Sequence, residues 1–320
     1  QFDQTLTITP ALAQFWKASR DGLTWTFTLR KGVKFHHGRE VIAEDVIYSF
    51  TRIVDPRTKS GAADLFLSIK GAKEFRDGKA KQISGLVALH PYSVQVTLTE
   101  ALAPFVSALA VGHAKIVPKE LVEQQGDAFG QHPVGTGPFK FVRWERGKEI
   151  VLAANPDYFT GAPRLSRLVY RIFPGEQSDA MYEEFQRGNL EDTPIPSQDY
   201  RQILTGKRHV YVKRPMLSVR FYGINTRVKP LNDRRVRQAL LFAIDREALL
   251  EEVFLGRYTL GRGILPPGTQ GFNPKLKGYA YNPARARELL SQAGYPGGRG
   301  LAPISIWSGA KRDEVIQEQE

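Results

Sequence analysis

The sequence predicts a mixed α/β or α+β fold, with several sheets and helices. Residues 23–29, Leu-Thr-Trp-Thr-Phe-Thr-Leu, alternate apolar residues with threonine, which is the pattern of a strand with one face in a core. Residues 42–53 instead repeat valine, phenylalanine and isoleucine on one face at helical spacing. A second amphipathic helix follows Asp233, a residue type suited to capping a helix N-terminus. Strands and helices therefore mix along the chain, as in folds that pack helices on sheets.

Composition narrows the class of protein. The chain has 320 residues, 42% hydrophobic and 24% charged, which is typical of a soluble globular protein large enough for two domains. The absence of cysteine excludes disulfides, thiolate metal sites and cysteine nucleophiles. The net charge is +12, but the basic residues are scattered without a patch or known motif, so we expect no nucleic-acid partner. No apolar run is long enough to span a bilayer, and no signal peptide is visible.

The first 130 residues predict a β-rich unit with helices. Asp21-Gly22 is a strong hairpin signal before the strand at 23–29, and residues 33–35 predict a second strand. Further along, apolar spacing predicts a hairpin and several helices in addition to the one at 42–53. The hairpin strands are expected at 83–89 and 93–98, and the helices at 66–75, 105–111 and from 118 onward.

A rigid corner follows at Gly135-Thr136-Gly137-Pro138. The two glycines accept backbone angles that other residues resist, and Pro138 fixes its own φ and favours an extended Gly137. Alternating apolar residues begin immediately afterwards, so the corner predicts the start of a strand or hairpin. A phosphate loop is rejected because neither the third glycine of a dinucleotide fingerprint nor a Gly-Lys-Ser/Thr sequence is present.

The second half predicts further strands and helices. Strands are expected at 148–153, 168–173, 210–212, 219–225 and 304–307. Helices are expected at 180–187, from 233 to 244, at 245–254 and at 282–293. Gly188 and Gly294 stand just past two of these helices, where glycine is a common C-cap.

No catalytic constellation emerges from the sequence. His36-His37 with two nearby glutamates matches no metal-binding spacing, and Gly38 predicts a turn, so we interpret these histidines as solvated turn residues. There is no Gly-x-Ser-x-Gly nucleophile elbow and no cysteine. Carboxylate pairs fall on polar helix faces, where solvation or salt bridges explain them. The sequence therefore favours a binding protein that is not an enzyme, with no metal and no cofactor.

Many short stretches together resemble one family, the solute-binding proteins of ATP-driven oligopeptide and dipeptide importers. The stretch from Ala11 to His36 looks like the family's signature, and Val236 to Arg246 is especially specific. The matching stretches in chain order are 11–36, 43–50, 103–105, 117–119, 133–139, 155–158, 187–192, 225–233, 236–246, 266–268 and 281–295. The resemblance covers nearly the whole chain.

The resemblance implies a periplasmic-binding-protein-like fold of two lobes with an extra small domain. It implies that residues 1–130 form the extra small α+β domain, 131–225 belong to the first lobe and 226–320 begin the second lobe. The corner then marks where the chain leaves the extra domain and enters the first lobe. Relative to the family, the N-terminal strand of the first lobe and most of the second lobe are missing. We therefore expect a chain truncated at both ends and an incomplete pocket.

The resemblance also implies a function. Two lobes would close around a short peptide, and the protein would deliver it to the membrane subunits of an ABC importer. We expect a monomer in the periplasm or outside the cell, with lipid anchoring left open. Other solutes on the same scaffold remain open, namely a metal chelate, haem or an oligosaccharide. A ligand-sensing domain of a regulatory protein is a further alternative. An enzymatic function would require that the missing part of the protein supply the catalytic groups.

The family's chain order suggests four ligand contacts: His113, Arg220, Tyr222 and Asn225. His113 lies in a loop and is equally well explained as a surface residue. Arg220 and Tyr222 share one face of the expected strand at 219–225, and a strand arginine is more often simply solvated. Asn225 is expected near the hinge. Backbone hydrogen bonds like those of an added strand would bind the peptide main chain, and charged groups would meet its termini.

Overall fold

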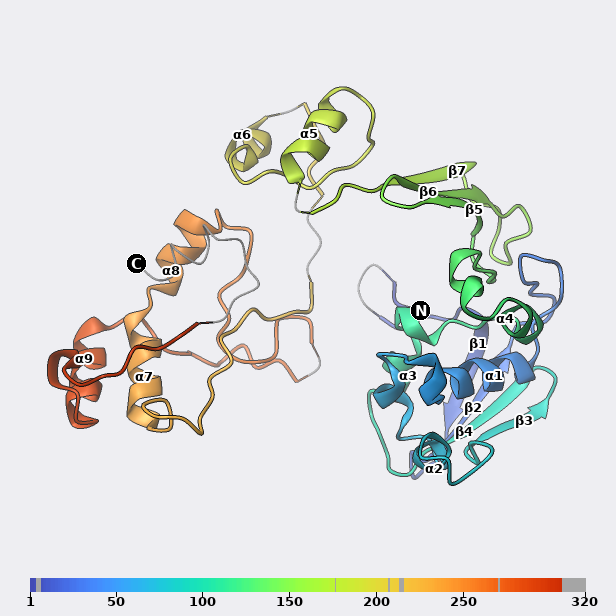
Figure 1. Cartoon of the computed structure of the whole chain (residues 1–320), viewed down its shortest axis with the longest axis horizontal. Coiled ribbons are helices and arrows are strands. Elements are labelled where there is room, and N and C mark those ends of the chain that lie inside the picture. The colour runs from blue at the N-terminus through green and yellow to red at the C-terminus, as the bar shows by residue number, and fades with distance from the viewer. Residues whose placement is uncertain (4–6, 176, 207, 213–215, 270, 307–320) are drawn as a thin grey trace. The chain divides into compact units, whose positions relative to one another are not determined.

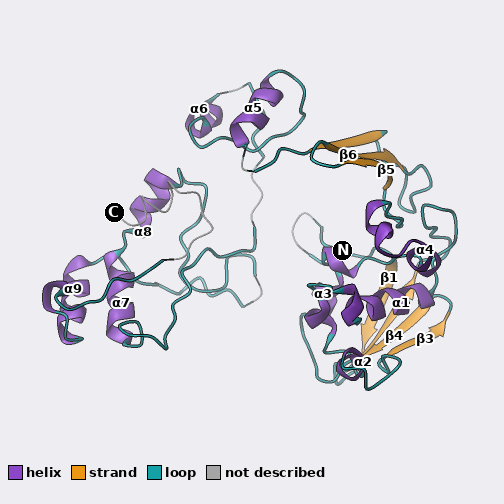
Figure 2. Ribbon diagram, viewed as in Figure 1, coloured by secondary structure: helices purple, strands orange, loops and turns teal. Residues whose placement is uncertain are grey.

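The computed structural model describes residues 1–3, 7–175, 177–206, 208–212, 216–269 and 271–306 (Figure 1). Contacts divide the chain into two compact units, residues 1–177 and 178–320, which are described separately. All the strands among the described residues belong to the first unit (Figure 2). No helix in these described ranges has the length and apolar character that a membrane span needs.

A four-stranded antiparallel sheet forms the centre of the first unit, in the order β1-β2-β4-β3. Its strands are β1 (Ala13–Ala18), β2 (Thr24–Leu29), β3 (Leu86–His90) and β4 (Ser93–Thr97). The expected alternation is confirmed in β2, where Phe27 and Leu29 are buried and the threonines are half-exposed. The predicted hairpin of residues 83–98 is confirmed as the β3–β4 pair.

Helix α1 (Ala43–Val54) packs against β3 and β4 of this sheet. The other helices of this part are α2 (Ala72–Arg76), α3 (Phe105–Leu109) and α4 (Lys119–Gln125), and α4 packs against α1. Short helical turns also occur at Pro56–Thr58, Ala63–Phe66, Gly112–Ala114 and Gly126–Gln131. The predicted helix at 42–53 is confirmed as α1, whose Phe50 packs on Phe66 with ring centroids 5.1 Å apart. One cluster of buried side chains from sheet and helices forms the main core.

Two predictions for this part are wrong. Residues 33–35 do not form a strand, because the chain turns back at once and Lys34 makes only an isolated bridge to Glu40. Their apolar side chains are nevertheless buried, in a small cluster of their own. Residues 66–75 are not one helix, because Gly71 adopts a left-handed φ of 83° that separates the turn at Ala63–Phe66 from α2.

The corner leads into a strand, as predicted, and this strand belongs to a three-stranded antiparallel sheet. Its order is β5-β6-β7, with β5 (Phe139–Glu145), β6 (Glu149–Ala154) and β7 (Arg167–Arg171). These strands correspond to the expected strands at 148–153 and 168–173 and to the expected hairpin after Pro138. Val151 in the middle strand is buried, with 1% of its surface exposed.

Helices and long connecting segments make up the second unit. The helices are α5 (Ser178–Gln186), α6 (Tyr200–Thr205), α7 (Arg234–Ala243), α8 (Arg246–Ala248) and α9 (Pro283–Gln292), with a π-helical turn at Leu249–Val253 and a 3₁₀ turn at Pro296–Gly298. Asp233 caps α7 by accepting a hydrogen bond from the Arg235 N–H at 2.8 Å, as predicted. α7 packs on α9 through Ala239, Ala286 and Leu289.

The strands predicted at 210–212, 219–225 and 304–307 are not present in the described residues, and Trp307 lies outside them. Most of the apolar residues that predict these strands are exposed instead, with Val210 at 90% and Phe221 at 74%. A strand is stable only when a neighbouring strand accepts its backbone hydrogen bonds. The described part of the second unit offers no such neighbour.

Candidate functional site

His36 forms hydrogen bonds to the corner at residues 135–138. These bonds join the corner to the part of the first unit that contains the four-stranded sheet. Its backbone N–H donates to the Gly135 carbonyl at 2.8 Å. Its ring Nε2 lies 3.0 Å from the Gly137 carbonyl oxygen, and its Nδ1 lies 3.4 Å from the Gly135 N–H. A neutral ring with its proton on Nε2 satisfies both side-chain contacts, because Nε2 then donates and Nδ1 accepts.

Asn155 also forms hydrogen bonds to the corner. Only 4% of its surface is exposed. Its side-chain amide donates to the Gly137 carbonyl at 3.2 Å, and its backbone N–H donates to the Pro138 carbonyl at 2.8 Å. The corner is therefore held between the turn at His36 and the end of β6, which fixes how the two sheets of the first unit meet.

The environment of His36 favours its neutral form. Burial lowers the pKa of the His36 imidazole, and the positive charge of Lys140 and the neighbouring His37 act in the same direction, against the hydrogen bond to Gly137. The sequence-based interpretation of His36 as a solvated turn residue is wrong, because its ring is half-buried against the corner.

A charged cluster lies next to this turn and joins α1 to α4. Arg39 donates two hydrogen bonds to Asp45, at 2.6 and 3.0 Å, and two to Glu120, at 2.6 and 2.9 Å. Asp45 also accepts from the Ile42 N–H at 2.9 Å and so caps the first turn of α1. His37 completes the cluster through a 3.0 Å contact between its Nε2 and Glu120.

The hydrogen bonds of this cluster stabilise the ionised forms of Glu120 and Arg39. Hydrogen bonding to Arg39 lowers the pKa of Glu120 to about 2. Hydrogen bonds to Asp45 and then to Glu120 raise the pKa of Arg39. The Arg39 guanidinium also stacks over the Phe35 ring, 5.0 Å from its centroid. Sequence reasoning missed this cluster because Arg39 and Glu120 are 81 residues apart.

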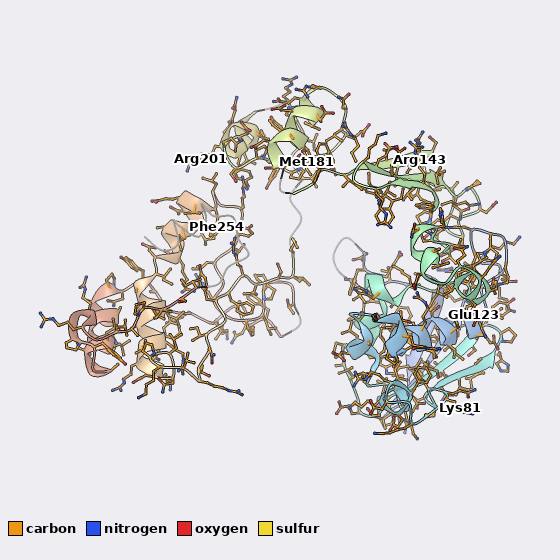
Figure 3. All side chains as sticks on the ribbon, in the orientation of Figure 1. Lys81, Glu123, Arg143, Met181, Arg201 and Phe254 are labelled. Carbon is orange, nitrogen blue, oxygen red and sulfur yellow. The ribbon has the colours of Figure 1, made fainter. Side chains whose placement is uncertain are left out.

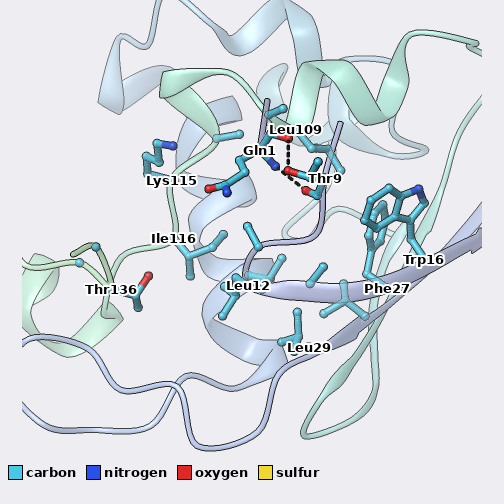
Figure 4. A pocket seen from close by; sticks show the side chains of 18 of the residues that line it. Gln1, Thr9, Leu12, Trp16, Phe27, Leu29, Leu109, Lys115, Ile116 and Thr136 are labelled. Atoms are coloured by element: carbon cyan, nitrogen blue, oxygen red, sulfur yellow. Dashed lines mark hydrogen bonds between the residues drawn. The ribbon is translucent and has the colours of Figure 1, made fainter. Parts of the chain in front are cut away.

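A cavity of about 510 Å³ opens beside the corner (Figure 4). Its walls come from β1, β2, α1, the segment after α3 and the corner itself, and most of its lining is apolar. Trp16, Leu109 and Ile116 line it, while Lys115 and Thr136 are among its polar residues. The corner residues Gly135, Thr136, Gly137 and Pro138 all contribute to one wall.

The four predicted ligand contacts are all exposed. His113 lies in the short turn Gly112–Ala114 of the first unit. Arg220, Tyr222 and Asn225 lie along one irregular segment of the second unit. The Arg220 guanidinium stacks over the ring of Phe254 (labelled in Figure 3), 5.2 Å from its centroid, and the Asn225 side chain accepts from the Arg227 N–H at 3.1 Å.

Comparison with known proteins identifies the family. The model "Bacterial extracellular solute-binding proteins, family 5 Middle" matches residues 7–315. The chain belongs to this family. The dipeptide-binding protein of Escherichia coli K12 is 31% identical over 319 residues, which are 95% of this chain and 58% of that protein. Haem-binding protein A of Haemophilus influenzae is 31% identical over 308 residues, covering 91% of this chain and 54% of that protein.

A solved family structure shares the fold. The periplasmic binding protein DppA of Helicobacter pylori, in complex with the peptide STSA, gives a TM-score of 0.76 at 32% identity and covers 92% of this chain. The match spans 59% of that structure. This confirms the predicted periplasmic-binding-protein-like fold, and the chain spans less than two thirds of the length of these family 5 relatives.

Proposed function

We propose that the full-length protein captures short peptides outside the cytoplasm and delivers them to the membrane subunits of an ABC importer. The observations that carry the proposal are the family match along nearly the whole chain and the similarity to a dipeptide-binding protein and to a protein solved with a bound peptide. Family 5 comprises solute-binding proteins, and we propose that this member likewise binds its ligand without catalysing a reaction.

The domain assignment belongs to this proposal. Residues 1–130 would form the extra small domain, 131–225 part of the first lobe and 226–320 the beginning of the second. The hydrogen bonds of His36 and Asn155 to the corner support a fixed joint between the first two parts. Ligand capture would then use movement of the second lobe, because closure between lobes buries a ligand that backbone and side-chain groups hold.

Four exposed residues are proposed to contact the peptide: His113, Arg220, Tyr222 and Asn225. Their exposure leaves them available to a ligand. Arg220 offers a guanidinium for a carboxylate, and its stacking on Phe254 holds the side chain in one orientation. Tyr222 is 48% exposed and adds an aromatic surface with a hydroxyl at its end.

Haem is the second candidate ligand. The haem-binding protein of Haemophilus influenzae has the same 31% identity to this chain as the dipeptide-binding protein of Escherichia coli. Overall similarity therefore does not separate the two ligand classes. The exposed His113 would offer an imidazole nitrogen as a ligand to the haem iron.

Localisation and assembly follow from the transport role. We propose a periplasmic or extracellular monomer, with or without a lipid anchor, whose macromolecular partner is the importer.

The alternative of a regulatory sensor predicts a DNA-binding or kinase segment elsewhere in the gene. A hydrolase assay on the full-length protein with short peptides tests the non-enzymatic assignment, and release of free amino acids would contradict it.

Thermal unfolding of the full-length protein tests the ligand class. A ligand that binds only the folded protein stabilises it by about 2.7 kcal/mol when its concentration is 100 times the Kd. We expect di- and tripeptides to raise the Tm, and haem, a nickel–histidine chelate and an oligosaccharide to leave it unchanged. A shift with one of those three and none with any peptide would contradict peptide capture.

A further inference from the structure

A tight turn at residues 254–257 joins two parts of the second unit that the proposed domain assignment places in different lobes. Residues 178–225 include α5 and α6 and would belong to the first lobe, whereas residues 226–320 include α7, α8 and α9 and would begin the second. Both parts lie in one compact unit. The lobe boundary between them is part of the proposed function, so the role assigned to this turn rests on that function.

Two contacts between an arginine and an aromatic ring cross this boundary in opposite directions. Arg257, from the second part, lies over the Tyr200 ring of α6, 4.3 Å from its centroid. Arg220, from the first part, lies over the Phe254 ring at 5.2 Å. Nη1 of Arg257 also donates a hydrogen bond to the Ser197 hydroxyl at 3.4 Å. Each part therefore supplies one guanidinium and one ring, and both contacts meet at the same turn.

The backbone of the turn places Phe254 and Arg257 side by side in the chain's path. Leu255 has a φ of 50° and Gly256 a φ of 70°, both in the left-handed region. The Arg257 N–H donates to the Phe254 carbonyl at 2.9 Å, and the Gly256 N–H donates to the carbonyl of Leu250 in the preceding π-helical turn at 2.8 Å. A leucine in the left-handed region is strained and persists only where surrounding contacts hold it. The two crossing contacts are such contacts.

The Arg257 contact forms at an electrostatic cost. Nε and Nη2 of Arg257 are buried and have no hydrogen-bond partner among the described residues, and no described carboxylate pairs with this guanidinium. An aromatic ring attracts a cation, but it does not replace a carboxylate as the partner of a buried charge. The net stability of the contact is therefore small, and separation of the two parts returns Arg257 to water.

We propose that Tyr200, Arg220, Phe254 and Arg257 form a joint that favours the closed arrangement of the two lobes. Contacts that exist only while the lobes touch favour closure, and the buried charge of Arg257 opposes it, so the equilibrium between open and closed forms stays near balance. A bound peptide can then shift it. Arg257 is a positioning residue, because it acts through Tyr200. Arg220 can serve both roles, since a ring takes the face of a guanidinium and a carboxylate takes its edge.

Electron paramagnetic distance measurements on the full-length protein, without a peptide, test the joint. Nitroxide labels are attached at Gln186→Cys in α5 and Arg287→Cys in α9, which are both exposed positions. The 320 residues contain no cysteine of their own, and any cysteine elsewhere in the protein is replaced by serine. The joined and separated forms should give two distances, whose relative populations report the equilibrium.

Three substitutions should change these populations differently. Phe254→Ala removes one ring contact and should lower the ratio of joined to separated forms by about threefold. Arg257→Met keeps the length of the side chain, removes the buried charge and should raise the same ratio by about threefold or more. Arg201→Met makes the same replacement at an exposed arginine beside Tyr200 and is the matched control, which should leave the ratio unchanged. Circular dichroism confirms that each variant is folded.

Peptide binding gives the second readout. Arg257→Met should bind a dipeptide about threefold more tightly, through slower release, because the closed form is more populated. The joint is overturned if Phe254→Ala and Arg257→Met have the populations of Arg201→Met, if they shift in the same direction, or if Arg257→Met binds peptide no more tightly than the unaltered protein does. Populations that shift as expected in a protein that binds no peptide would instead overturn peptide capture and leave the joint standing.

Discussion

His36 uses both ring nitrogens to hold the corner, and only the neutral ring can do so. Because the folded state lowers the pKa of His36 below its usual 6.5, the unfolded state binds a proton first as the pH falls. The stability that His36 contributes is therefore fully present above pH 6.5 and is lost as the pH falls below it. We expect the free energy of unfolding to decrease between pH 7 and pH 5.

Urea unfolding at a series of pH values measures this effect in the unaltered protein and in His36→Gln. The variant cannot titrate at this position, so its stability should fall less between pH 7 and pH 5. His113→Gln removes an exposed histidine and should keep the full pH dependence. Equal slopes in His36→Gln and the unaltered protein would contradict the role given to His36.

Arg39 and Glu120 share hydrogen bonds, but we expect the substitution of Arg39 to lower the free energy of unfolding by more than the substitution of Glu120. Asp45 has 4% of its surface exposed, and Arg39→Ala would leave its carboxylate buried without a counter-charge. We expect a loss of about 3 kcal/mol in the free energy of unfolding. The Glu120 side chain is 44% exposed, so Glu120→Gln should cost about 1 kcal/mol or less. Denaturant unfolding at pH 7 compares them, and a larger loss in Glu120→Gln would be the contrary result.

The contrast between these residues shows what the sequence could predict at this scale. The cap at Asp233 could be predicted, because donor and acceptor are two residues apart. The role of Arg39 could not, because its partner on α4 comes close only once the fold has formed. The burial of His36 was missed for the same reason, since the corner that covers it lies about 100 residues later.

At the scale of elements, Gly85 leads into β3 at a point where the backbone of other segments lies very close. A Cβ at this position would be 2.5 Å from the Thr97 carbonyl oxygen and 2.8 Å from that of Lys70. Neither is a flexible side-chain atom, so Gly85→Ala must displace backbone that is hydrogen-bonded to β4. We expect a loss of about 2 kcal/mol or more, by the mechanism of overpacking.

Gly130 provides the control for this prediction. A Cβ there would meet nothing within 4 Å, and its φ is not in the left-handed region. Gly130→Ala should therefore leave the Tm within about 2 °C of the unaltered protein, whereas Gly85→Ala should lower it clearly. Thermal unfolding followed by circular dichroism gives both values, and similar Tm values for the two variants would refute the steric argument.

Elements with strong local signals could be predicted, and elements that need a distant partner could not. The amphipathic spacing of α1 and the alternation in β2 are local, and both elements form where predicted. Residues 219–225 alternate in the same way but form no strand, since a strand also needs a neighbour to pair with. Pattern alone therefore overestimates strands in the second unit.

At the scale of the whole molecule, the family could be predicted from the sequence, because many short stretches match in the family's order. The four proposed ligand contacts, in contrast, have no such match that tests them. His113 and Arg220 belong to different units, and this chain spans 58% of the length of the dipeptide-binding relative. Their role therefore remains a prediction about the full-length protein.

Calorimetric titration of the full-length protein with di- and tripeptides tests the central claim most directly. We predict saturable binding of one peptide per protein, weakened by about tenfold or more in Arg220→Ala if its guanidinium meets the peptide carboxylate. Arg201→Ala, an exposed arginine of the same unit (labelled in Figure 3), is the control and should bind as the unaltered protein does. Binding of haem or another non-peptide solute, with no heat from any peptide, would contradict peptide capture.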